Sequence, residues 1–152
     1  MNRKVLLVVL TLAVFLLVTP YVGGVYAKKP LSVSFTSTGT GVLSSVARPA
    51  GESDNVITEA VHNLAWTGDF EGTCIMEVRL VFHEEGYNYQ EIVTFTGTVS
   101  GEHTGTLTIV GGQGNWRIIG GTGELSNLHG QGKMELTGIA TFTFTGQVHF
   151  DP

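Results

Sequence analysis

The sequence predicts an all-β protein: a single antiparallel sheet of about eight strands, closed into an up-and-down barrel and preceded by an N-terminal signal peptide. Three observations predict this architecture. Apolar and polar residues alternate along most of the chain after Pro30, which is the pattern of half-buried strands. Glycine-containing turns separate the alternating runs at short intervals, as in sandwiches and barrels. A basic and then apolar segment occupies the first 27 residues.

The N-terminal segment has the three parts of a secretory signal. Arg3 and Lys4 precede an uncharged run over residues 5–18 that is dominated by Leu and Val, and Ala27 supplies the small residue at a cleavage site. We expect cleavage after Ala27, which leaves one domain, residues 28–152, secreted or in the cell envelope. Because no charge interrupts residues 5–26, the alternative is that this segment is retained as a membrane anchor.

Charge and cysteine content narrow the classes of partner. The chain carries a net charge of −5, and removal of Arg3 and Lys4 with the leader takes it to −7. An acidic chain without a basic stripe argues against nucleic acid as a partner. Cys74 is the only cysteine, so the domain has no internal disulfide and relies on its core, where we expect this thiol to be buried.

Four alternating runs define the clearest strands, and they cover residues 58–66, 74–82, 93–99 and 142–150. Each places apolar side chains on one face and Thr or charged side chains on the other, as strands with one face against a core do. Residues 48–55 are polar, contain Pro and Gly, and are predicted to form a loop. Short hairpin links favour a closed barrel, because closure removes exposed edges. The predicted core is Trp66, Val78, Phe95, Leu107, Trp116, Ile118, Phe142 and Phe144.

Residues 111–132 form the most glycine-rich part of the chain. Within them, residues 115–119 (Asn-Trp-Arg-Ile-Ile) lie between two Gly-Gly pairs, so we predict a short strand between two tight glycine turns. We expect Gly121 or Gly123 to take a positive φ in the turn after Ile119. The phosphate-binding pattern Gly-x-Gly-x-x-Gly is absent from the segment, so these glycines are interpreted as structural.

Three segments share a pattern of turns: residues 68–72 (Gly-Asp-Phe-Glu-Gly), residues 94–109, and residues 120–132, which begin with Gly-Gly-Thr-Gly. Together they resemble a family of small microbial proteins of unknown function that is related to the allene oxide cyclase-like and dirigent-like barrels. The resemblance implies an eight-stranded barrel whose apolar lumen holds a reactive intermediate in one conformation. It also implies that no cofactor is needed and that the protein forms homo-oligomers. The matched segments carry no catalytic residue.

Four residues are the candidate ligand contacts. His62, Glu91 and His103 fall on the inward-facing positions of their runs, and Trp116 lies in the short glycine-flanked strand. A carboxylate or imidazole at a barrel mouth acquires a shifted pKa when it is desolvated, and it then serves as an acid or base. The competing interpretation is structural: Glu91 and His103 lie at strand ends, where side chains reach water, and His62 is an ordinary core histidine.

Two classes of function remain open from the sequence. The first is a binding protein for a small apolar or aromatic ligand held in the barrel, extended to a cofactor-free cyclase or isomerase. The second is a non-enzymatic structural or interaction module of the cell envelope, with a filled barrel. No metal site is expected, because the five histidines lack the spacing of a local ligand pair. A lumen of about 300 Å³ or more with convergent polar groups would favour the first class.

Overall fold

The computed structural model describes residues 29–51, 54–138 and 140–152, and in them it contains eight strands. They are β1 (Leu31–Pro49), β2 (Val56–Gly68), β3 (Phe70–His83), β4 (Gly86–Val99), β5 (His103–Gly112), β6 (Asn115–Gly123), β7 (Leu128–Gly138) and β8 (Thr141–Phe150). The predicted signal peptide, its cleavage site and the alternative anchor lie outside the described residues. Within the described residues, no helix has the length and hydrophobicity of a membrane span.

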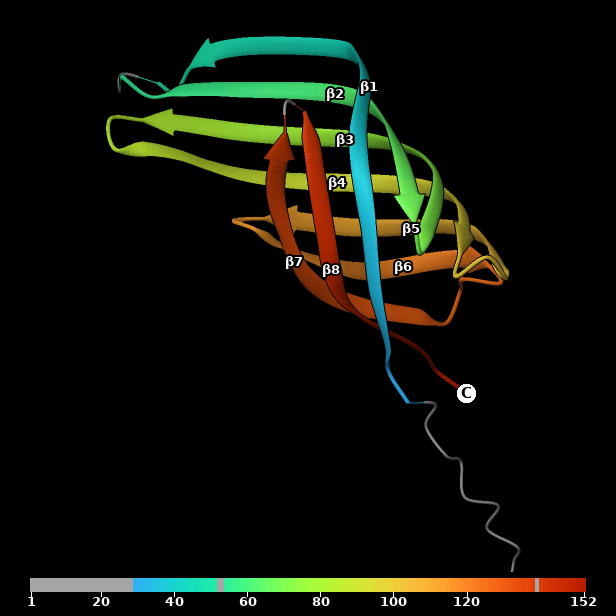
Figure 1. Ribbon diagram of the computed structural model, residues 1–152. Helices are drawn as coiled ribbons and strands as arrows, with labels where there is room; N and C mark the ends of the chain where they lie inside the picture. Colours follow the sequence, from blue (N-terminus) through green and yellow to red (C-terminus); the bar gives the residue numbers. More distant parts are fainter. Residues whose placement is uncertain (1–28, 52–53, 139) are drawn as a thin grey trace, which may run out of the picture.

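The eight strands form one antiparallel sheet that closes on itself. Each strand pairs with the next, and β8 pairs back to β1, from Leu31 opposite Val148 to Thr38 opposite Thr141. Figure 1 shows β1 running beside β8 while it also leads into β2. The all-β class, the antiparallel order and the strand number are therefore as the alternation predicted, and the sheet is barrel-like.

Three local predictions are wrong. Arg48 and Pro49, assigned to a loop, belong to β1 and pair with Ile57 and Val56. The Gly-Gly pair at 120–121, predicted as a turn, lies inside β6, which runs on to Gly123. The Gly-Gly pair at 111–112 likewise ends β5, and the turn follows at 113–114. Of the two glycines expected to take a positive φ, Gly123 does, at 64°.

Aromatic rings occupy the interior. Phe35, Trp66, Phe70, Phe95 and Phe144 are at most 3% exposed, and their ring centroids lie 4.4–6.1 Å apart in the contacting pairs. Six of the eight predicted core residues are buried, while Val78 and Phe142 are half-buried. Cys74 is buried as expected, and its burial raises the pKa of the thiol. The core is therefore a packed aromatic cluster on the inner face of the sheet.

A row of glycines lets the sheet bend tightly enough to close. Gly72 pairs with Gly97, Gly97 with Gly105, and Gly105 with Gly123, across β3 to β6. A Cβ added at Gly72 would come within 2.8 Å of the Gly97 Cα, and one at Gly97 would meet the Glu71 carbonyl oxygen. The two backbones approach this closely only because neither residue carries a side chain.

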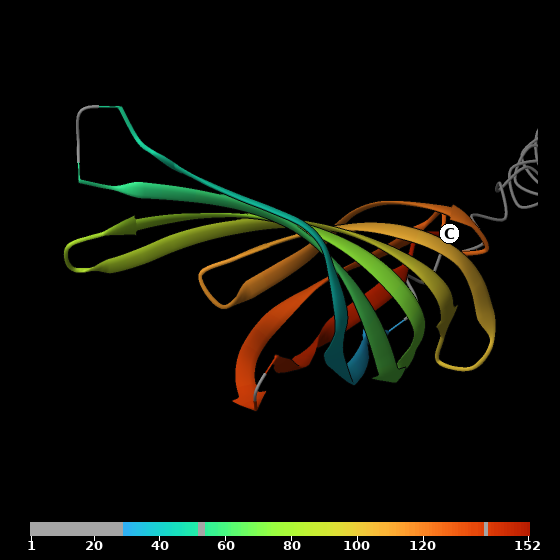
Figure 2. The same cartoon turned by 90° about the horizontal axis from the view of Figure 1, so that it is seen from above.

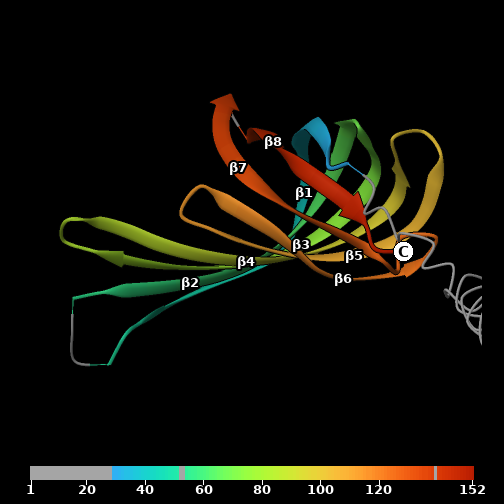
Figure 3. The same cartoon turned by 90° about the horizontal axis from the view of Figure 1, so that it is seen from below.

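The hairpins β1–β2 and β3–β4 extend beyond the closed ring. Because β8 pairs with β1 only as far as Thr38, the rest of β1 continues with β2 as its one paired strand. Figures 2 and 3 show the two hairpins projecting together to one side of the molecule. We call this projection the arm; it consists of residues 40–49, 56–62, 76–83 and 86–91. Its inner face continues the inner face of the ring.

Candidate functional site

Glu91 lies on the inner face, where the arm joins the ring. It pairs with Val78 on one side and with Gly111 on the other, and Gly111 pairs in turn with Trp116. The Glu91 side chain extends over Gly111, where an added Cβ would lie 2.7 Å from the Glu91 Cγ. Glu91 is 7% exposed, and no described residue hydrogen-bonds to its carboxyl group. Desolvation raises its pKa to about 7.

Trp116 lies in the same cross-strand row of paired residues as Glu91, but its indole nitrogen already donates hydrogen bonds within the protein. The indole Nε1 donates to the carbonyl oxygens of Lys133, at 3.1 Å, and Thr145, at 3.2 Å. The residue is 2% exposed, and its ring lies 5.8 Å from that of Phe35. Trp116 thus fills the space above Gly132 and Gly146, which face it across β7 and β8. Its predicted role as a ligand contact stays a prediction.

The structure does not bring the four predicted residues into one site. His62 is half-buried and pairs with Met76. This pair lies on the inner face, in the cross-strand row adjacent to the row that contains Glu91. His103 pairs with Val99, eight residues along β4 from Glu91 and so at the other end of the ring. There its ring centroid lies 4.5 Å from that of Phe150. His62 and Glu91 therefore share one end of the inner face, and His103 is remote from both.

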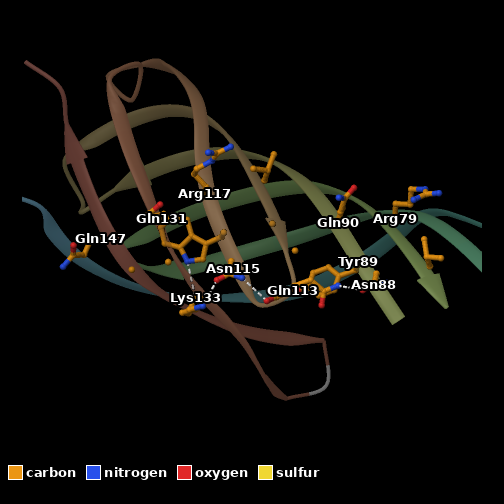
Figure 4. Close-up of a pocket in the computed structure, with 17 residues that line it drawn as sticks. Arg79, Asn88, Tyr89, Gln90, Gln113, Asn115, Arg117, Gln131, Lys133 and Gln147 are labelled. Atoms are coloured by element: carbon orange, nitrogen blue, oxygen red, sulfur yellow. Dashed lines mark hydrogen bonds between the residues drawn. The ribbon is translucent and has the colours of Figure 1, made fainter. Parts of the chain in front are cut away.

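A large depression lies on the outer face of the sheet. Its volume is about 920 Å³ and it is open to solvent. Figure 4 shows the residues that line it. It is lined by outward-facing side chains of β3 to β8, by the β5–β6 turn and by glycine backbone. Tyr89 and Trp116, from the inner rows, also line it, so one of the four predicted ligand contacts borders this depression. We call it the polar groove; its lining includes the cations Arg79, Arg117 and Lys133, the carboxamides Asn88, Gln90, Gln113, Asn115, Gln131 and Gln147, and the glycines Gly111, Gly112, Gly132 and Gly146.

The polar groove concentrates positive charge in an acidic chain. The described residues include five Lys and Arg, of which three line the groove, while its lining contains no Asp or Glu. Lys133 Nζ donates to Asn115 Oδ1 at 2.6 Å, and Arg79 Nε lies 3.6 Å from Glu59 Oε1 outside the groove. Arg117 has no ion-pair partner among the described residues. One guanidinium is therefore unpaired and a second only weakly paired.

Hydrogen bonds hold the arm end of the groove in place. Gln113 Nε2 donates to Asn88 Oδ1 at 3.1 Å, and the Gly114 amide donates to the Tyr89 hydroxyl at 3.0 Å. These contacts tie the β5–β6 turn to β4. Desolvation is the main cause that raises the pKa of Tyr89, and the nearby charge of Glu91 adds to it. The groove is thus a surface held in place by its own hydrogen bonds.

The register also creates a small cluster that no sequence spacing indicated. His129 pairs with His149, and their Nε2 atoms lie 3.1 and 3.5 Å from the two oxygens of the Asp151 carboxylate. All three side chains are about half exposed. Among the described residues, no group of three His, Cys, Asp or Glu has an arrangement suited to a metal ion. We therefore interpret the cluster as surface ion pairs.

Fold and groove together define the class of this protein: an all-β domain of eight antiparallel strands in a closed ring, with a packed interior and a polar outer depression. Its fold is similar to that of a protein of unknown function from the DUF3224 family of Shewanella oneidensis MR-1, with a TM-score of 0.66. The two chains are 14% identical, and the match covers 82% of this chain and 99% of the other. This similarity shows a shared fold.

Comparisons of sequence add no relative. No family model matches the chain, and no curated protein matches it. The relation to allene oxide cyclase-like and dirigent-like barrels stays a prediction from the residues that carry the resemblance.

Proposed function

We propose that this protein is a non-enzymatic binding module whose polar groove holds an anionic, hydroxyl-rich ligand, such as a stretch of acidic polysaccharide. The observation that carries the proposal is the lining of the groove: three of the five described cations, with carboxamides on every side and no carboxylate. With the predicted leader, we place this activity outside the cytoplasm, in the secreted or envelope fraction. A retained leader would place it at the membrane surface.

The chemistry of the lining matches such a ligand. Guanidinium groups bind carboxylates and sulfates through paired, charge-assisted hydrogen bonds, and Arg117 is free to do so. Asn and Gln side chains both donate and accept, which suits hydroxyl groups. The groove is an open depression rather than an enclosed cavity, so it favours an extended chain over a buried small molecule.

The packed interior supports this proposal over a ligand held in the lumen. Phe35, Trp66, Phe95 and Phe144 occupy the centre of the ring in mutual contact, so an apolar ligand there would have to displace buried rings. Of the two classes left open by the sequence, the geometry favours the interaction module with a filled interior.

Glu91 favours a second candidate function. It is a buried carboxyl group with a pKa of about 7 beside the half-buried Tyr89 and Val78, on the inner face of the arm. A group that titrates near neutral pH is suited to acid–base chemistry on an apolar ligand bound there. In this candidate the ligand lies at the mouth of the ring rather than in its centre, which retains the cofactor-free isomerase hypothesis in a different place.

Loss of one groove cation should weaken ligand binding about tenfold, because a charge-assisted hydrogen bond contributes about 1.5 kcal/mol or more. We would titrate the protein by calorimetry with polygalacturonate, alginate and dextran sulfate, and with neutral dextran for comparison. Arg117→Gln and Lys133→Gln should each weaken binding of the anionic polymer that binds most tightly.

Lys29→Gln is the matched control, since it removes one positive charge outside the groove. It should leave the affinity unchanged. Equal binding of neutral dextran, or equal weakening by Lys29→Gln, would show that the groove does not recognise the charge of its ligand.

A further inference from the structure

The outer half of β1 is an open sheet edge. Residues 40–49 pair with β2 on one side, whereas on the other side the pairing with β8 ends at Thr38 and Thr141, followed by one bond from the Gly39 amide to the Ala140 carbonyl. No described strand lies along residues 40–49 on that side. This row of backbone donors and acceptors has no partner strand in the monomer, and such an edge pairs readily with another chain.

The side chains of residues 40–47 do not protect this edge. All ten residues from 40 to 49 are exposed, including Val42 at 62%, Leu43 at 56% and Val46 at 60%. No charged residue occurs from Leu31 to Ala47, so this stretch lacks the lysine or glutamate that usually guards an edge strand. Arg48, which pairs with Glu59 of β2, and Pro49 come only at the end of the edge. Two bulges fall before Ser44, but from Ser44 to Pro49 the register with β2 is regular, opposite Val61 to Val56.

The opposite edge of the arm differs. There β4 extends beyond its last pair with β5, Glu91 opposite Gly111. The β5–β6 turn bonds to two residues of this extension, from Gln113 to Asn88 and from Gly114 to Tyr89. The acidic residues Glu84 and Glu85 stand at its tip. The β4 edge of the arm is therefore partly occupied, whereas the β1 edge is open.

We propose that two copies of this chain pair along residues 40–47 of β1, antiparallel about a two-fold axis perpendicular to the sheet. A closed two-fold dimer requires a surface that complements itself. An uncharged edge strand meets this condition, because two antiparallel copies of it exchange backbone N–H and C=O hydrogen bonds with each other. The absence of charge matters here, since the acidic chain would repel its copy across most other surfaces.

The arrangement would also bring the exposed apolar inner faces of the two arms onto one side of a continuous sheet. These faces carry Val56 at 40%, Phe82 at 42% and Tyr87 at 55% exposure, with the Phe82 and Tyr87 rings 5.9 Å apart. The ring and the polar groove stay outside the interface, so the dimer is independent of the proposed ligand.

Sedimentation velocity tests this proposal. The parent protein should sediment with twice the mass of the chain. Leu43→Lys combined with Val46→Lys should raise the dimer dissociation constant at least about tenfold, because each dimer then places four ammonium groups along one short interface. Both positions are more than half exposed in the monomer, so the far-ultraviolet circular dichroism and the melting temperature at low concentration should not change.

Ile92→Lys is the matched control: Ile92 is 50% exposed on β4, which is paired on both sides at that position. It should leave the dimer intact. A monomeric parent, or a dimer that the double lysine variant leaves unchanged, would overturn the proposal. Capture by the parent of an extended peptide from another protein, with no self-association, would overturn it as well.

Discussion

Replacing Phe144 with alanine should lower the free energy of unfolding by about 3–5 kcal/mol, the usual cost of truncating a buried aromatic side chain. Phe144 is 3% exposed, and its ring lies 4.7 Å from that of Phe35 and 5.3 Å from that of Trp66. The loss removes apolar contacts and leaves a cavity in the centre of the ring. Equilibrium unfolding in guanidinium chloride measures the difference.

Thr145→Ala is the matched control for this variant. Thr145 is the next residue of β8, faces outward and is exposed, and only its backbone carbonyl bonds to Trp116. Its replacement should change the free energy of unfolding by less than about 0.5 kcal/mol. Comparable losses from the two substitutions would show that the inner and outer faces of β8 are wrongly assigned.

Glu91→Gln should stabilise the protein at alkaline pH and leave it nearly unchanged at pH 4. Burial raises the pKa of Glu91 from 4.5 to about 7, so the folded state retains a proton that the unfolded state has lost between these values. The parent therefore loses stability as the pH rises from about 5 to 8, by roughly 3 kcal/mol from this one group. Glutamine does not ionise, so the variant avoids that loss.

Denaturant unfolding at a series of pH values measures this effect. Glu77→Gln is the control, because Glu77 lies on the exposed outer face of β3, one strand away from Glu91. It should reproduce the pH dependence of the parent. If Glu91→Gln also retained the parent's fall in stability between pH 5 and 8, Glu91 would not be the buried group responsible.

The fold was predictable because its determinants are local. The alternation of Phe95 with threonines shows which face of β4 is buried, and turn residues mark the hairpins. The Gly-Gly pair at 120–121 was assigned to a turn because glycine serves two purposes that sequence alone does not separate. In this sheet, Gly121 gives room to the Leu125 backbone, which an added Cβ would meet. The glycine is required because the β6–β7 turn folds back onto β6 at this point, not because the chain turns at Gly121 itself.

The polar groove was not predictable because it depends on register. Arg79, Arg117 and Lys133 belong to three strands, and each alone is an ordinary charge on a wet face. Only the pairing of strands β3 to β8 brings them around one depression. The alternation of apolar and polar residues correctly predicted that Glu91 faces inward. Its distance from His103 depends on the length of β4 and on its register with neighbouring strands, which alternation within one strand does not reveal.

Methyl-selective NMR titration with the tightest-binding acidic polysaccharide distinguishes a ligand in the polar groove from one in the interior. The methyl groups of Val81 and Val110 line the groove, whereas Val93 is buried in the core. If ligand binds in the polar groove, the Val81 and Val110 signals should shift with ligand concentration while that of Val93 stays in place. Shifts of Val93, or shifts confined to Val78 beside Glu91 on the inner face of the arm, would contradict binding in the groove.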